Sequence, residues 1–147
     1  MSARDEITDL IYTYADRIDA GDFEGVGAIL GTGSLTFDGA LDPISGPDAI
    51  TKTYEATTRR FANGTPNTKH IMTNVMVSVD PDEIHASSKS YYTVLHALPG
   101  EFALQPIIAG RYHDTFQKVN GKWQFLTMHI FVDLVGDLST LLSPGTL

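Results

Sequence analysis

Two side chains near the end of the first predicted helix have the chemistry of a catalytic site: the phenol of Tyr14 and the carboxylate of Asp19. Apolar residues recur at helical spacing from Ile7 to Ile18, and Gly21 ends the predicted helix. Tyr14 lies on the apolar face and Asp19 at its edge, where a carboxylate can reach a pocket between helix and sheet. A phenol can donate a hydrogen bond to developing negative charge, and a carboxylate can take or orient a proton.

Histidine is the side chain that titrates nearest to neutral pH, and the sequence holds five. His70 is predicted on a strand, on one face with Met72, Asn74 and Met76, which is typical of a pocket wall. The others lack the spacing with carboxylates that a metal site needs; they are His85, His96, His113 and His129. Without cysteine or a glycine-rich phosphate loop, we expect no metal and no other cofactor.

Composition limits the partners of this chain. With 147 residues, 42% of them hydrophobic and 19% charged, it is typical of one globular domain, residues 1–147. The net charge of −8 disfavours nucleic acid and anionic membranes and suits a small, largely apolar organic ligand. Neither a signal peptide nor a membrane span is predicted, so we expect a cytoplasmic protein.

The periodicity changes from helical to extended along the chain. Ser2 or Asp5 is expected to cap the first helix, which is followed by helices over 23–30 and 47–61 and a short strand over 34–37. Four long strands are predicted over 68–79, 83–98, 102–118 and 122–134, before a C-terminal tail over 134–147. Helices followed by an antiparallel meander predict an α+β fold with the helices on one sheet face.

The face of such a sheet that points away from the helices must be buried by another surface if it is apolar. Val75, Val77 and Val79 alternate along the first long strand and would make its outer face apolar. We therefore expect a homodimer that buries this outer face.

In this order and spacing, several short motifs resemble the SnoaL-like branch of the nuclear-transport-factor-2-like superfamily over nearly the whole chain. The motifs are Tyr14-Ala15-Asp16, Asp19-Ala20-Gly21-Asp22, Ser45-Gly46-Pro47-Asp48-Ala49-Ile50, Lys69-His70, Gly110-Arg111-Tyr112-His113-Asp114 and Asn120-Gly121-Lys122-Trp123. The resemblance implies a cone-shaped α+β barrel, with three N-terminal helices packed on a curved, mostly antiparallel sheet. Because this fold hosts many reactions, the resemblance does not by itself give the activity.

Asp19 and His70 match the Asp–His dyad of scytalone dehydratase and of hexachlorocyclohexane dehydrochlorinase. The resemblance implies that the carboxylate orients the imidazole, which abstracts a proton during elimination of water or halide. The sequence departs from scytalone dehydratase at Ile18, where that enzyme has tyrosine.

An alternative follows from ketosteroid isomerase. Tyr14 and Asp38 match its oxyanion-hole tyrosine and its proton-shuttling aspartate, and Tyr112 takes the place of its protonated aspartate. This alternative predicts isomerisation or cyclisation through an enolate. The arrangement of limonene epoxide hydrolase is excluded, because Arg111 and Asp114, three positions apart on one strand, point to opposite faces.

We expect an apolar pocket between the helices and the concave sheet face. Beside the five candidate catalytic residues Asp19, His70, Tyr14, Tyr112 and Asp38, its expected lining is Ile18, Phe37, Tyr54, Met72, Tyr92, Phe125 and His129. The leading hypothesis is a cofactor-independent lyase acting on a small, apolar, cyclic ligand, with Tyr14 or Tyr112 as hydrogen-bond donor. A noncatalytic ligand-binding or assembly module is the third hypothesis.

Overall fold

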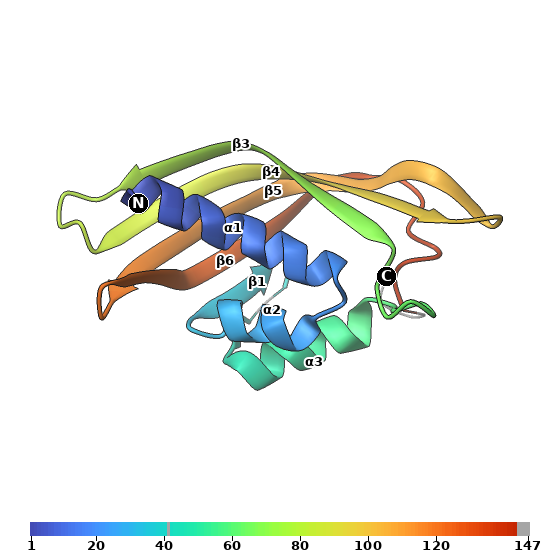
Figure 1. Cartoon of the computed structure of the whole chain (residues 1–147), viewed down its shortest axis with the longest axis horizontal. Coiled ribbons are helices and arrows are strands. Elements are labelled where there is room, and N and C mark those ends of the chain that lie inside the picture. The colour runs from blue at the N-terminus through green and yellow to red at the C-terminus, as the bar shows by residue number, and fades with distance from the viewer. Residues whose placement is uncertain (41, 144–147) are drawn as a thin grey trace.

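Three helices lie against one face of a six-stranded sheet in this computed structural model, which describes residues 1–40 and 42–143 (Figure 1). The helices are α1 (Ala3–Asp19), α2 (Phe23–Leu30) and α3 (Pro47–Thr57). The strands are β1 (Ser34–Phe37), β2 (Ile44–Ser45), β3 (Thr68–Val79), β4 (His85–Leu98), β5 (Phe102–Val119) and β6 (Lys122–Val135). The predicted α+β class is confirmed.

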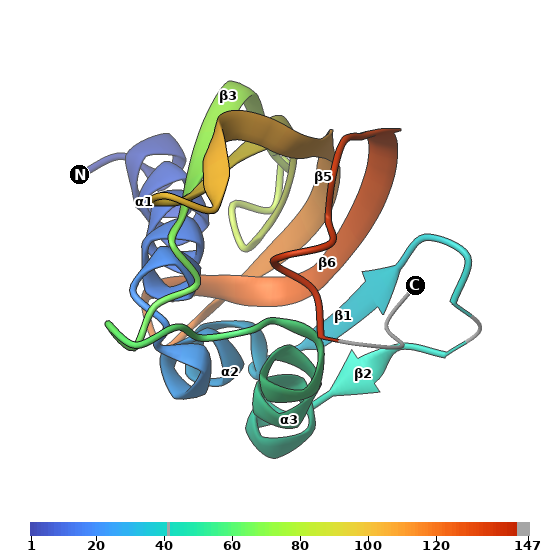
Figure 2. The ribbon, with the colours of Figure 1, turned by 90° about the vertical axis from the view of Figure 1, so that its right-hand side faces the viewer.

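The sheet has the order β2-β1-β6-β5-β4-β3, so β3 forms one edge. All neighbouring strands run antiparallel except β1 and β6, which run parallel. Seen from its end, the sheet curves around the helices, with α1 beside β3 and with α2 and α3 near β1 and β2 (Figure 2). This curvature makes a cone whose concave side faces the helices.

Local sequence signals explain where the helices begin. Ser2 and Asp5 form a reciprocal capping box at α1, and the Asp22 side chain accepts a hydrogen bond from the Gly25 backbone N–H in α2. Helix α3 begins with Pro47 at its first turn, as expected. It ends at Thr57 rather than at residue 61, because Thr58 is extended and pairs with the C-terminal segment. A tertiary contact thus overrides the local helical pattern.

The predicted apolar outer face of β3 is wrong. The β3–β4 register shifts between Thr73 and Met76, and Asn74 has φ of 53°, which indicates a bulge. Beyond it the side chains change faces: Val75 and Val77 pack against the core, while Met76 is exposed. His70 therefore does not share a face with Met76.

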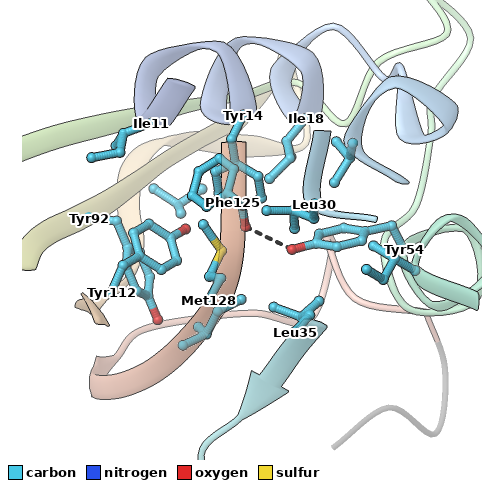
Figure 3. Close-up of a cluster of buried hydrophobic side chains, with 14 of the residues drawn as sticks. Ile11, Tyr14, Ile18, Leu30, Leu35, Tyr54, Tyr92, Tyr112, Phe125 and Met128 are labelled. Carbon is cyan, nitrogen blue, oxygen red and sulfur yellow. Dashed lines mark hydrogen bonds between the residues drawn. The ribbon is translucent and has the colours of Figure 1, made fainter. Parts of the chain in front are cut away.

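Aromatic and aliphatic side chains fill the space between the helices and the concave sheet face (Figure 3). Leu138 and Leu141 of the C-terminal segment are also buried, and residues 144–147 of the predicted tail lie outside the described residues. None of the helices in the described chain has both the length and the apolar composition needed to cross a bilayer.

Candidate active site

Asp19 and His70 are joined directly, at the seam between the end of α1 and the start of β3. Asp19 Oδ1 accepts hydrogen bonds from His70 Nδ1 at 2.7 Å and from Thr68 Oγ1 at 2.8 Å. Asp19 Oδ2 accepts one from the His70 backbone N–H at 2.7 Å. The carboxylate therefore fixes both the backbone and the ring of His70.

The pairing sets the tautomer of His70. Because a carboxylate only accepts hydrogen bonds, Nδ1 carries the proton, and in the neutral ring Nε2 holds the lone pair. Nε2 makes no hydrogen bond to any residue within the described ranges. The side chains of His70 and Asp19 are 11% and 12% exposed, so the pair is largely screened from water but still reachable.

The electrostatics of the pair favour an ionised carboxylate. Burial alone raises the pKa of Asp19, but the hydrogen bonds and charge of His70, with the Thr68 hydrogen bond, outweigh burial and lower the pKa below its ordinary value. Asp19 is consequently negative at neutral pH, and it stabilises positive charge that develops on the imidazole when His70 accepts a proton.

The pair borders a groove of about 620 Å³ between α1 and the edge strand β3. Helix α1 contributes Asp9, Tyr12, Thr13, Ala15, Asp16 and Asp19. Strand β3 contributes Lys69, His70 and Met72. The groove thus brings the imidazole of His70 together with the phenol of Tyr12 and the apolar side chains of Ala15 and Met72.

The candidate residues Tyr14 and Tyr112 lie elsewhere, in the closed core. Their rings pack edge to face with centroids 5.6 Å apart, and the hydroxyls of Tyr14 and Tyr54 are 2.7 Å apart (Figure 3). Burial raises the pKa of both Tyr14 and Tyr112 well above the ordinary value. Neither lines the groove, so the structure does not bring these phenols to His70.

Most of the expected pocket lining belongs to the same packed core. Ile18, Tyr54, Tyr92 and Phe125 are buried there, and Phe37 and Met72 pack against them from its margin. Tyr92 stacks on Tyr112 with centroids 4.5 Å apart and donates a hydrogen bond to the Phe131 carbonyl oxygen at 2.8 Å. Burial, with the charge of Asp133, raises the pKa of Tyr92 to about 12.

Two predicted residues are separate from this core. Asp38 is exposed in the turn after β1. His129 pairs across the sheet with His113 and stacks on Phe131, while its neighbours Met128 and Ile130 are buried. Since side chains alternate along a strand, His129 lies on the outer face of the sheet and not in the expected pocket.

The sequence did not identify two polar side chains that the structure singles out, the Thr68 hydroxyl bonded to Asp19 and the buried carboxyl of Asp114. Thr68 completes the hydrogen bonds to Asp19, and its position two residues before His70, on the same strand face, is the signal that could have identified it. Asp114 is 1% exposed inside the sheet, and its closest hydrogen-bond partner is the Ser88 hydroxyl at 3.5 Å. Burial raises the pKa of the Asp114 carboxyl well above its ordinary value, which the Ser88 hydrogen bond only partly offsets.

Arg111 lies on the face opposite Asp114, as expected, and pairs with Asp133 at 2.9 Å. Within the described ranges, no three histidine or carboxylate side chains are grouped so that they could hold a metal ion.

Fold and site together define a class: a small α+β cone with a histidine–carboxylate pair at the seam of its first helix. A profile described as a SnoaL-like domain matches residues 1–129. The chain therefore belongs to the SnoaL-like family, within the nuclear-transport-factor-2-like fold. No curated relative matches the sequence.

Solved structures share the fold at low sequence identity. A protein of unknown function from Nostoc punctiforme has a TM-score of 0.75 at 23% identity, covering 94% of this chain and 98% of that one. A candidate scytalone dehydratase from Novosphingobium aromaticivorans has a TM-score of 0.71 at 22% identity, covering 90% of this chain and 85% of that one. ActVI-ORFA from Streptomyces coelicolor has a TM-score of 0.70 at 18% identity, covering 88% of this chain and 96% of that one. These similarities support the fold alone.

Proposed function

We propose that this chain is a cofactor-independent lyase that removes a proton from a small organic molecule and eliminates water or halide. The observation that carries the proposal is the Asp19–His70 pair, whose free Nε2 belongs to a residue that lines the groove. A candidate scytalone dehydratase shares the fold, so dehydration is among the reactions that this fold accommodates. The apolar part of the ligand would lie on Ala15 and Met72.

The proposed mechanism uses groups that line one groove. His70 Nε2 takes a proton from carbon, and the C–H electrons form a double bond as the neighbouring C–O or C–halogen bond breaks. Asp19 stabilises the resulting imidazolium through Nδ1. Tyr12, rather than the buried Tyr14 or Tyr112, donates to the leaving oxygen or to a developing enolate. A departing hydroxide takes a proton from Tyr12 or from the imidazolium.

The mechanism is tested with cyclic β-hydroxy ketones and chlorocyclohexanes, followed by absorbance of the conjugated product and by chloride release. Loss of a general base costs about 10²–10⁴-fold in rate, so His70→Ala and Asp19→Asn should each lower turnover at least a hundredfold. Tyr14→Phe should retain activity, because its hydroxyl faces Tyr54 in the core. Full turnover in both dyad variants would overturn the proposal.

The same variants separate the alternatives. An isomerase acting through an enolate predicts that Asp38→Asn is more damaging than His70→Ala. The exposed turn position of Asp38 gives that alternative less support. A noncatalytic module predicts no turnover of any compound found in the groove and a stable complex with a larger partner chain.

We also propose a homodimer through the outer sheet face. Its residues differ from the expected Val75, Val77 and Val79, because Val75 and Val77 pack against the core. All three helices lie on the other side, while Tyr91 is 51% exposed and Phe131 packs between His129 and Arg111 (Figure 2). Of the two acidic residues in β3–β6, Asp114 is buried and Asp133 pairs with Arg111, so the acidic excess of the chain lies elsewhere. A monomer mass in sedimentation at micromolar concentration would contradict this assembly.

A further inference from the structure

The hydroxyl of Thr68 is bound to the carboxylate that pairs with His70. It donates to Asp19 Oδ1 at 2.8 Å, and the same oxygen accepts a hydrogen bond from His70 Nδ1 at 2.7 Å. The other oxygen, Oδ2, accepts one from the His70 backbone N–H. Thr68 is 5% exposed and lies outside the described lining of the groove, so its hydroxyl contacts the carboxylate and not a ligand.

A carboxylate needs a contact at each oxygen to keep its plane fixed. The His70 backbone N–H holds Oδ2, but a carboxylate held at one oxygen can still turn about the bond to its carboxyl carbon, because that torsion has broad minima. The Thr68 hydroxyl holds Oδ1, so the imidazole meets an acceptor at a constant position. Since Thr68 is buried, water has little access to replace this donor.

The backbone beside Thr68 is held by a buried histidine. His96 is opposite Thr68 in the β3–β4 register and is 1% exposed. Its Nδ1 donates a hydrogen bond to the carbonyl oxygen of Asn67 at 2.8 Å, and Asn67 has the left-handed φ of 54° that asparagine accepts at low cost. The threonine hydroxyl therefore comes from a fixed position at the start of β3.

A second aspartate–histidine pair, in the turn between β3 and β4, provides a comparison. Asp82 accepts hydrogen bonds from the His85 backbone N–H at 3.0 Å and from His85 Nδ1 at 2.7 Å, as Asp19 does from His70. Its further donor among the described residues is a backbone N–H, that of Ile84, and both side chains of the pair are 46% exposed. The buried pair differs in having a side-chain hydroxyl on the oxygen that faces the ring.

We propose that Thr68 is a positioning residue of the dyad, whose hydroxyl holds the Asp19 carboxylate in the orientation that fixes the imidazole of His70. The consequence for turnover rests on the proposed function, whereas the holding of the carboxylate does not. A base displaced from its productive geometry loses rate, so the hydroxyl should matter for kcat although it touches no substrate.

Two measurements on the full chain, by nuclear magnetic resonance, need no substrate. The Nδ1 proton of His70 should give a signal in the wild type, because it is hydrogen-bonded and largely screened from water, whereas that of the exposed His85 should exchange too fast to be seen. Thr68→Val removes the hydroxyl at nearly the same shape and should broaden the His70 signal. It should also raise the pKa of the Asp19 carboxyl, because the Thr68 hydrogen bond helps to lower that pKa.

Two further variants make the test specific to the hydroxyl. Thr68→Ser keeps it and should restore both the His70 signal and the low pKa of Asp19. Thr73→Val makes the same change at an exposed position of β3 and should alter neither. Thr68→Ala, which also lacks the hydroxyl, replaces Thr68→Val if the larger side chain prevents folding.

Turnover of the cyclic β-hydroxy ketones and chlorocyclohexanes gives the catalytic readout. Thr68→Val should lower kcat about tenfold and leave KM within about twofold, because it displaces the base without changing the lining of the groove. Thr68→Ser should recover most of the lost kcat.

The outcomes separate this inference from the proposed reaction. An unchanged His70 signal and an unchanged Asp19 pKa in Thr68→Val, or equal changes in Thr68→Ser, would overturn the inference whatever the turnover. Wild-type kcat in Thr68→Val, alongside a large loss in His70→Ala, would overturn it as well. Full turnover in His70→Ala, or no turnover by any variant, counts against the proposed reaction alone, and the two substrate-free measurements then decide whether Thr68 holds the pair.

Discussion

Replacing Asp19 by asparagine tests whether the carboxylate holds the seam between α1 and β3. The carboxylate accepts three hydrogen bonds, from the Thr68 hydroxyl and from two nitrogens of His70. Asparagine has nearly the same shape, but its one oxygen can replace only one carboxylate oxygen, and its NH₂ group cannot accept. His70 would lose the partner that fixes its tautomer.

The expected cost follows from these contacts. A hydrogen bond to a charged group contributes about 1.5–3 kcal/mol net, and two of the three are weakened or lost. Because Asp19 is 12% exposed and water can replace part of the loss, we take the lower value for each, which gives about 3 kcal/mol. For a chain of this length that free energy corresponds to a fall in Tm of about 6–12 °C.

The pH dependence provides the sharper test. Since the native pKa of Asp19 lies below its ordinary value of 3.8, its contribution to stability is complete above about pH 4. It is lost as the pH falls through the lowered native pKa. The stability difference between wild type and Asp19→Asn should therefore be full at pH 7 and shrink below pH 4.

Urea unfolding followed by circular dichroism measures this difference at a series of pH values. Asp16→Asn, one helical turn earlier and exposed, is the control and should leave the urea midpoint unchanged within error. Equal stability of wild type and Asp19→Asn at pH 7, or a difference that persists unchanged at pH 3, would refute the claim that the ionised Asp19 carboxylate stabilises the contact between α1 and β3.

Three further substitutions test other parts of the structure. Burial raises the native pKa of Asp114, so wild-type stability should fall as pH rises above 3.8, and Asp114→Asn should remove that fall in urea midpoints measured from pH 4 to 8; an identical pH dependence would contradict it. Gly33→Ala would put a Cβ 1.8 Å from the Leu126 carbonyl oxygen, so we expect a loss of at least about 2 kcal/mol on thermal unfolding, and an unchanged Tm would be the contrary result. Arg111→Ala breaks a pair with Asp133 that is exposed in the single chain, so it should barely move the urea midpoint at a protein concentration low enough to dissociate the proposed dimer; a large shift at that concentration would contradict it.

Several elements were predictable because their signals are local. The apolar period of α1 and its cap at Ser2 place Tyr14 inside. Asn120 and Gly121 both have positive φ, as the hairpin turn between β5 and β6 requires, and they are the residues that adopt such angles at low cost. Caps and turns depend on neighbours within a few residues, so the sequence displays them directly.

The bulge at Asn74 was not predictable from alternation, because one extra residue in β3 reverses every side chain after it. Nor was β2, whose two residues become a strand only by pairing with β1, or the parallel pairing of β1 with β6. Asparagine accepts the left-handed conformation more readily than most residues, which is the one local hint at the bulge.

The sequence by itself determined which groups could do chemistry: a carboxylate at the edge of a helix, a histidine on a strand and phenols on an apolar face. The resemblance implied that Asp19 pairs with His70, but only the tertiary structure decided that the phenols of Tyr14 and Tyr112 lie in the core, away from this pair. Asp19 and His70 lie side by side because the end of α1 packs against the start of β3, whereas Tyr14, five residues before Asp19, turns into the core. Because an α-helix turns once every 3.6 residues, Tyr14 and Asp19 do not point in the same direction. The residues of α1 that line the groove beside Asp19 include Tyr12 and Asp16, but not Tyr14.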